Sequence, residues 1–168
     1  MKYFLVTVDK NYTAPVPIGW YGVLDRKSLK EKKFYQMQKH LLFYIENQMQ
    51  TVFTDIIIFP CYLVSKLVKD IISCYDPFIK FSRVIFYDRK KKQGMTYYLP
   101  FFYKMEAEEK RYEEGKQKRE IILEKKELER HVVLEVNTSF ETLVFMRVDL
   151  VESILRRGAV GIGVEEIE

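Results

Sequence analysis

A helix that leads directly into a glycine-rich strand ends this sequence, and this closing segment constrains the fold more than any other. Asp149 can cap the helix, and Gly158 stands where a helix stops in the left-handed conformation. A strand, Gly-Ile-Gly-Val-Glu-Glu-Ile, begins at Gly161. Between cap and stop, apolar residues recur at the spacing of one helix face: Leu150, Val151, Ile154 and Leu155. The pattern predicts that a helix and a strand close the domain.

The three glycines of this closing segment do not form a phosphate-binding loop. A dinucleotide fingerprint places a strand before its glycines and a helix after them. Gly158, Gly161 and Gly163 follow a helix and enter a strand, so the order is reversed. Arg156 and Arg157 fall in the last helical turn, where their positive charge stabilises the helix C-terminus.

Composition favours one folded domain with substantial β-structure. The chain has 168 residues, of which 48% are apolar and 31% are charged, which excludes a disordered chain. Aromatic residues make up 15%, and aromatic residues favour strands. We therefore expect a single α+β domain over residues 1–168, in which a mostly antiparallel, aromatic-rich sheet is packed by about three helices.

Periodicity predicts the individual elements. Helices are expected near 28–49, 65–75 and 149–157, with Ser65 as an N-cap and Asp76-Pro77 as a stop. Strands are expected at 2–8, 20–24, 55–59, 81–88, 95–105, 132–136 and 142–148, with hairpin turns before 95 and before 142. The expected core contains Leu5, Ile57, Leu67, Val68, Ile71, Ile72, Ile85, Val133, Val144, Ile154 and Leu155.

The segment 104–130 is charged, and its acidic and basic residues balance. One interpretation is a solvated helix with ion pairs at spacing four, such as Glu106 with Lys110. The other is an exposed loop around Gly115 followed by a strand through 120–123. Gly115 favours the second interpretation, because glycine weakens a helix interior.

Charge and targeting signals exclude several classes. The net charge of +4 is too small for a strong nucleic-acid footprint, so nucleic acid is an unlikely partner. No apolar run approaches the roughly 18 residues of a membrane span, and we expect no signal peptide at residues 1–9, because they alternate and turn polar at Asp9. Cys61 and Cys74 stand in apolar settings, which is typical of free thiols in a reducing cytoplasm. We expect a cytoplasmic protein with no membrane partner.

The sequence shows no motif for catalysis. His40 and His131 each lack a nearby second ligand, so we expect no metal site. No Walker-type loop and no Gly-X-Ser-X-Gly motif occur, and nothing marks Cys61 as a nucleophile. We therefore expect no catalytic residue and no cofactor, although an enzyme of unrecognised type stays open as an alternative.

Two basic clusters are candidates for binding a partner. One lies at 26–33 and the other, 89–92, at an expected hairpin turn. Solvated turns and helix faces are the simplest explanation of both clusters. Tyrosine with arginine is also the composition of protein-binding hot spots, and tyrosine can stack on nucleic-acid bases. The residues of the candidate partner-binding site are Tyr87, Arg89, Lys90, Lys91, Lys92, Tyr97 and Tyr98.

The order of segments adds a resemblance. Leu-Val-Ser-Lys-Leu-Val-Lys-Asp-Ile-Ile at 63–72 precedes the strand 81–88 and Tyr-Tyr-Leu-Pro at 97–100. His-Val-Val-Leu-Glu-Val follows at 131, and Val-Asp-Leu-Val-Glu-Ser-Ile-Leu-Arg-Arg-Gly-Ala-Val-Gly-Ile ends the series. This order resembles the small cytoplasmic proteins found beside bacterial polymorphic-toxin genes and assigned as toxin-immunity proteins. The resemblance covers most of residues 50–168.

The resemblance implies a non-enzymatic protein that neutralises a cognate protein toxin by direct contact. It carries over no functional residue, because such families diverge at the contact surface. A mildly basic chain counts against a nuclease partner unless an acidic patch exists, and 106–114 and 165–168 are the candidates for one. The alternative is a nucleic-acid-binding or regulatory module that uses the clusters at 26–33 and 89–92.

Overall fold

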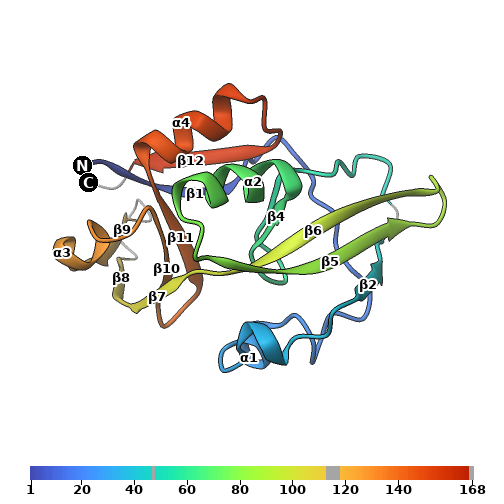
Figure 1. Ribbon diagram of the computed structural model, residues 1–168, viewed down its shortest axis with the longest axis horizontal. Helices are drawn as coiled ribbons and strands as arrows, with labels where there is room; N and C mark the ends of the chain where they lie inside the picture. Colours follow the sequence, from blue (N-terminus) through green and yellow to red (C-terminus); the bar gives the residue numbers. More distant parts are fainter. Residues whose placement is uncertain (47, 113–117, 167–168) are drawn as a thin grey trace.

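The computed structural model describes residues 1–46, 48–112 and 118–166 and has the expected α+β architecture. The described residues form four helices, a short 3-10 helix and twelve strands (Figure 1). In chain order these are β1 (Tyr3–Val8), α1 (Arg26–Leu29), η1 (Phe34–Gln36), β2 (Leu41–Tyr44), β3 (Ile56–Ile57), β4 (Leu63–Ser65), α2 (Lys66–Tyr75), β5 (Lys80–Asp88), β6 (Gln93–Phe101), β7 (Tyr103–Glu106), β8 (Glu108–Tyr112), β9 (Lys118–Ile122), α3 (Lys125–Leu128), β10 (Val133–Asn137), β11 (Thr142–Arg147), α4 (Val148–Arg156) and β12 (Ile162–Glu166).

The strands form two five-stranded sheets and a separate hairpin, where the sequence predicted one sheet. The terminal sheet, which contains the first and last strands, has the order β12-β1-β11-β10-β7. The hairpin sheet has the order β2-β5-β6-β4-β3, and β8 pairs only with β9 among the described strands. Pairing is mostly antiparallel, as expected. Among the described pairs of strands, β10 with β7 and β2 with β5 run parallel, as does the isolated bridge between Thr13 and Thr51.

Helices α2 and α4 pack against each other, α2 over β4 and β6 of the hairpin sheet and α4 over β1 and β11 of the terminal sheet, and they build the largest core cluster (Figure 1). The hydroxyl of Tyr75 on α2 lies 3.0 Å from the carbonyl oxygen of Asp149 and 2.6 Å from the hydroxyl of Ser153 on α4. A second cluster fills the inner face of the hairpin sheet beneath residues 14–37. A third covers the opposite face of the terminal sheet.

Most of the expected core is buried in these clusters. Leu67 and Ile85 are only half-buried, and Leu155 was predicted wrongly because 45% of its surface is exposed. Leu155 follows Ile154 on α4 and faces away from α2. The buried members of the expected set are Leu5, Ile57, Val68, Ile71, Ile72, Val133, Val144 and Ile154.

Helix α2 begins and ends where the sequence predicts. The Ser65 hydroxyl accepts a hydrogen bond from the Val68 backbone N–H at 3.3 Å, as an N-cap does. Helix α4 differs at its start, because Arg147 is the N-cap residue and Asp149 lies in the first turn. Two nitrogens of Arg147 donate to the Asp149 carboxylate at 2.7 and 2.8 Å. This pair holds the pKa of Asp149 below its usual value, chiefly through the Arg147 hydrogen bonds.

The end of α4 agrees with the sequence analysis. Gly158 has a φ of +78°, which glycine adopts without the strain of a side chain. Arg157 donates to the Ser153 carbonyl oxygen at 3.1 Å and so satisfies a free carbonyl of the last turn.

The helix predicted at 28–49 is wrong. Helix α1 has only four residues, η1 follows it, and β2 then pairs in parallel with β5. Leu41 and Phe43 are buried while Leu42 and Tyr44 are exposed, which is the period of a strand. Residues 20–24, predicted as a strand, form turns that lead to the Asp25 cap of α1. Strand β3 is shorter than the predicted strand 55–59.

The split interpretation of 104–130 is the better one. Strand β9 covers most of the predicted strand, whereas the loop around Gly115 lies outside the described residues. Strands β7 and β8 and helix α3 were not predicted separately. The segment is not uniformly exposed, because the buried Glu109 carboxylate accepts hydrogen bonds from Thr138 at 2.7 Å and Arg111 at 2.7 Å.

Candidate functional site

One face of the hairpin sheet is only partly covered by the rest of the molecule. Helix α2 lies over the end of this face near β4, whereas the β5–β6 hairpin extends well past α2 (Figure 1). We term the uncovered part the outer face. In register across three strands, it consists of Leu42 and Tyr44 on β2, Arg83, Ile85 and Tyr87 on β5, and Thr96 on β6.

The outer face presents large apolar and aromatic groups in a fixed arrangement. Leu42 and Tyr44 are exposed to 54% and 39%. The rings of Tyr44 and Tyr87 meet edge to face with centroids 6.3 Å apart, and the guanidinium carbon of Arg89 lies 3.5 Å from the Tyr44 centroid. The cation–π contact holds Arg89 against the sheet, so aromatic surface and positive charge occupy one patch.

Gly94 makes room for this arrangement. It pairs with Tyr87 across β5 and β6, and a Cβ atom at position 94 would lie 3.1 Å from Tyr87 Cδ2. That distance is shorter than ordinary carbon contacts. Glycine therefore lets the Tyr87 ring lie across the neighbouring strand.

The turn between β5 and β6 holds four cations in an ordered geometry. The buried Asp88 carboxylate accepts hydrogen bonds from the backbone N–H groups of Lys90 and Lys91 at 2.9 and 3.1 Å. Lys92 adopts a φ of +50° and completes the turn. Arg89, Lys90, Lys91 and Lys92 are exposed beside the outer face. A smaller hollow of about 330 Å³ lies between this turn, Ile18 and Tyr44.

The structure brings most of the predicted partner-binding residues together, with one correction. Tyr87 lies on the outer face, Arg89, Lys90, Lys91 and Lys92 border it, and Tyr98 lies next to it on the part of the sheet that α2 covers. Tyr97 does not belong to the site. It is fully buried in the inner core and donates to the Thr54 carbonyl oxygen at 2.8 Å. Adjacent strand residues point to opposite faces, so Tyr97 and Tyr98 cannot share a surface.

Tyr98 is half-buried where α2 reaches the hairpin sheet. The ammonium of Lys69 lies 4.9 Å from its ring centroid. Leu42, Tyr44 and Ile85 belong to the outer face but were not among the predicted site residues. The sequence carried no local signal for Leu42 and Tyr44, because residues 41–44 are all apolar or aromatic and only their burial in the structure alternates.

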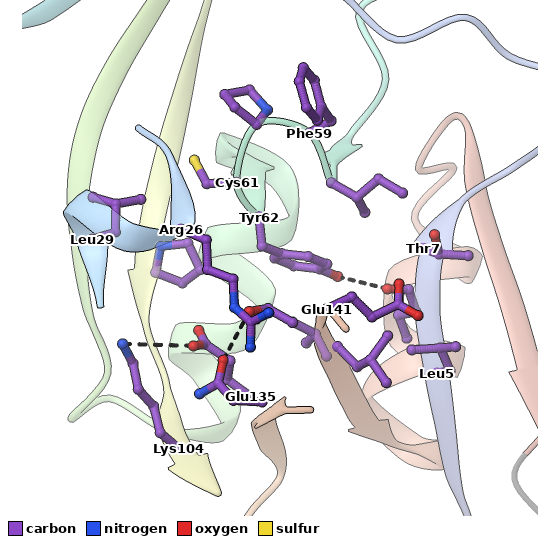
Figure 2. A pocket seen from close by; sticks show the side chains of 18 of the residues that line it. Leu5, Thr7, Arg26, Leu29, Phe59, Cys61, Tyr62, Lys104, Glu135 and Glu141 are labelled. Atoms are coloured by element: carbon purple, nitrogen blue, oxygen red, sulfur yellow. Dashed lines mark hydrogen bonds and ion pairs between the residues drawn. The ribbon is translucent and has the colours of Figure 1, made fainter. Parts of the chain in front are cut away.

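A second feature, a cleft of about 500 Å³, opens where the two sheets diverge (Figure 2). One wall is the face of the terminal sheet that bears Lys104 and Glu135. The facing wall is α1 with residues 58–62. Arg26, from the other basic cluster, donates to the Thr138 carbonyl oxygen at 2.7 Å and reaches across the cleft. No pattern in the sequence predicts this cleft.

Charged groups of both signs gather at one end of the cleft, near the Lys104 and Glu135 labels of Figure 2. The Glu135 side chain is only 14% exposed, and its nearest cation, the Lys104 ammonium, is 3.7 Å away. Burial raises the pKa of Glu135, while the charges of Lys104 and, more weakly, Arg26 oppose the rise. Thr142 donates to the Asn137 side-chain oxygen at 2.9 Å beside this group.

Cys61 lines the cleft but is not an activated nucleophile. Burial raises the pKa of its thiol, and the nearby Glu135 charge adds to the rise, so the thiolate is disfavoured. No histidine is among the described residues that line the cleft. His131 instead stacks on Tyr103 with ring centroids 4.1 Å apart. Cys74, expected in an apolar setting, is exposed.

No family model and no curated protein matches this chain. Its function is therefore argued from its own surfaces. Among the described residues, no group of three or more histidine, cysteine, aspartate or glutamate side chains is arranged to hold a metal ion. Each described helix is too short or too polar to span a bilayer. Within the part of the chain that the structure describes, the outer face and the cleft are the two features suited to binding.

Proposed function

We propose that this protein is a non-enzymatic binding protein that neutralises a bacterial protein toxin by direct contact through its outer face. The observation that carries the proposal is the patch in which Leu42, Tyr44 and Tyr87 are accessible beside Arg89. Tyrosine and arginine dominate the energetic centres of protein interfaces. The resemblance of segment order to toxin-immunity proteins supports the same role.

The charge of the outer face indicates the kind of toxin surface it would contact. No acidic side chain stands at the outward positions of β2, β5 and β6, all of which are described, whereas Arg83, Arg89 and the turn lysines stand on or beside the face. An acidic surface on the toxin complements this charge and speeds association. The proposal therefore disfavours a toxin whose contacted surface is basic.

The proposal places the protein in the cytoplasm. Both cysteines are free in the structure, which is consistent with a reducing compartment. An immunity protein in that compartment would meet its toxin where the toxin acts.

The test is capture of the toxin encoded beside this gene, followed by alteration of the outer face. Leu42→Ser combined with Tyr44→Ala should weaken the complex at least about tenfold, since each removes a large exposed contact group. Phe78→Ser is the matched control, because Phe78 is 79% exposed but lies outside the outer face. Failure of every neighbouring gene product to bind, or equal binding by both variants, would contradict the proposal.

The nucleic-acid alternative makes a different prediction at the same turn. Lys90, Lys91 and Lys92 are exposed together, and phosphate contacts make binding fall steeply with salt. The triple glutamine variant should then lose RNA or DNA affinity and flatten the salt dependence. Binding of a protein toxin that persists at high salt, with no nucleic-acid binding, would favour the toxin-neutralising role.

A further inference from the structure

The inward face of the terminal sheet changes character along its length. Toward α2 and α4, this face carries Val133 and Met146, which are buried in the main core. Toward the cleft, the same face carries Lys104 and Glu106 on β7, Glu135 and Asn137 on β10, and Thr142 on β11. On this face polar residues therefore follow core residues along β10 and β11, and β7 adds Lys104 and Glu106, where the cleft begins.

The facing wall of the cleft carries the cations Arg26 of α1 and Lys30, its C-cap, together with an apolar patch. Leu29, Phe59, Pro60 and Phe101 form this patch. Phe59 is 52% exposed at the mouth, and its other side packs against Trp20 with ring centroids 5.1 Å apart. The cleft thus places an apolar patch and Arg26 opposite the Lys104 and Glu135 pair, and its volume lies in the usual range for small-molecule sites.

At the end of the cleft near Lys104 and Glu135, the charged groups are only loosely paired with one another. The 3.7 Å between Lys104 and Glu135 exceeds the roughly 2.7–2.9 Å of a close charge-assisted hydrogen bond. Arg26 uses one terminal nitrogen for the Thr138 carbonyl oxygen, and no carboxylate pairs with it among the described residues. Figure 2 shows the Arg26 side chain reaching toward Glu135 from the facing wall. Well-packed apolar residues would be at least as stable here, so the charges point to a binding role.

We propose that this cleft binds a free α-amino acid with a large apolar side chain. The amino acid's ammonium group would contact Glu135, its carboxylate would contact Lys104 and Arg26, and its side chain would lie against Phe59 and Phe101. A zwitterion matches a site that presents both signs of charge within one pair of strands. A simple amine or a simple acid would leave one of the two signs without a partner.

Binding can be followed with Trp20, the only tryptophan of the chain, because its ring contacts Phe59. L-phenylalanine is the probe, with tryptophan excited where phenylalanine does not absorb and with calorimetry as a second readout. 2-Phenylethylamine lacks the carboxylate and 3-phenylpropionate lacks the ammonium group. Each should bind about tenfold or more weakly than L-phenylalanine, since each loses charge-assisted hydrogen bonds. No saturable binding of L-phenylalanine, or equal binding of either analogue, would overturn the proposal.

Two variants separate the charges. Glu135→Gln should weaken the binding of L-phenylalanine and 2-phenylethylamine but not of 3-phenylpropionate. Lys104→Gln should weaken the binding of L-phenylalanine and 3-phenylpropionate but not of 2-phenylethylamine. Loss of folding cannot produce such opposite preferences. Lys27→Gln is the control, because Lys27 is an exposed cation of α1 that does not line the cleft. Unchanged L-phenylalanine affinity in both cleft variants would overturn the assignment of the charges.

This inference is independent of toxin binding. The cleft and the outer face use different residues, so the Leu42→Ser, Tyr44→Ala variant should retain L-phenylalanine binding. A protein that binds its toxin but no amino acid would refute only the cleft proposal.

Discussion

The two sheets of this protein differ in how far helices cover them. In the terminal sheet, α4 packs over β1 and β11, Val133 and Met146 are buried in the core cluster that it shares with α2, and the cleft begins beyond these residues. In the hairpin sheet, α2 covers the end near Tyr98 and leaves Leu42, Tyr44 and Tyr87 uncovered. Both candidate binding features therefore begin where helix packing stops. Each sheet thus has a helix-covered part that contributes to stability and an uncovered part that is a candidate for binding.

The strongest test of this division lies within β2, where neighbouring residues face opposite sides. Phe43 is buried against Phe86 with ring centroids 6.4 Å apart. Phe43→Ala should lower the free energy of unfolding by about 3–5 kcal/mol. Leu42→Ser, one residue earlier on the outer face, should change it by less than about 1 kcal/mol. Urea denaturation measures both, and a large loss for Leu42→Ser would show that the outer face is part of the core.

Helix α4 offers the second matched pair. Ile154 is buried between α4 and the terminal sheet, whereas Leu155 is 45% exposed. Ile154→Ala should cost about 2–5 kcal/mol in thermal or urea unfolding, because it leaves a cavity. Leu155→Ala should cost under about 1 kcal/mol. Equal losses for the two variants would mean that α4 is rotated relative to the core.

Sequence periodicity predicts the elements that carry a local signal, whether or not helices cover them. Helices α2 and α4, the β5–β6 hairpin and the β10–β11 pair each carry their own local pattern of cap, period or turn. Residues 10–50 do not, because β2 is held by parallel pairing with β5, some forty residues away in sequence. Leu41, Leu42 and Ile45 fit a helical stripe as well as a strand, and only this distant pairing decides between them.

The candidate sites were predictable to different degrees. The charged turn at 89–92 is a local feature, so its exposure followed from the sequence. Tyr97 was wrongly assigned to the binding surface, although the strand period already puts it on the opposite face from Tyr98. The cleft was not predictable, because Arg26, Lys104 and Glu135 come from separate segments. Its one local signal was the alternation in β10 of buried Leu134 and Val136 with Glu135 and Asn137.

A substitution at the start of α2 should have a smaller effect on stability. It tests the edge of the part of the hairpin sheet that α2 covers. Ser65 is buried, and its hydroxyl caps the helix that covers one end of the hairpin sheet. Ser65→Ala should cost about 1 kcal/mol in unfolding free energy, and Ser65→Thr should recover part of the loss. The toxin-binding and amino-acid-binding readouts should both be unchanged, because neither feature uses the cap. A change in either readout would mean that the position of α2 shapes the neighbouring binding feature.

The smallest expected effect is the change in stability caused by Glu135→Gln. Its sign distinguishes a carboxylate kept for binding from one that stabilises the fold. Burial raises the pKa of Glu135 above its ordinary value, so ionised Glu135 lowers stability at neutral pH. Glu135 has a higher pKa in the folded state than in the unfolded state. Its protonation therefore stabilises the native state, fully so below the unfolded-state pKa. This stabilisation is lost as pH rises through the folded-state pKa. Glu135→Gln should therefore stabilise the protein at pH 7 and have almost no effect near pH 4, as measured by urea midpoints at the two values. Destabilisation at pH 7 would show that the ion pair with Lys104 holds the two strands together. If Glu135→Gln stabilises the protein and also abolishes L-phenylalanine binding, the carboxylate is needed for binding although it lowers the stability of the fold.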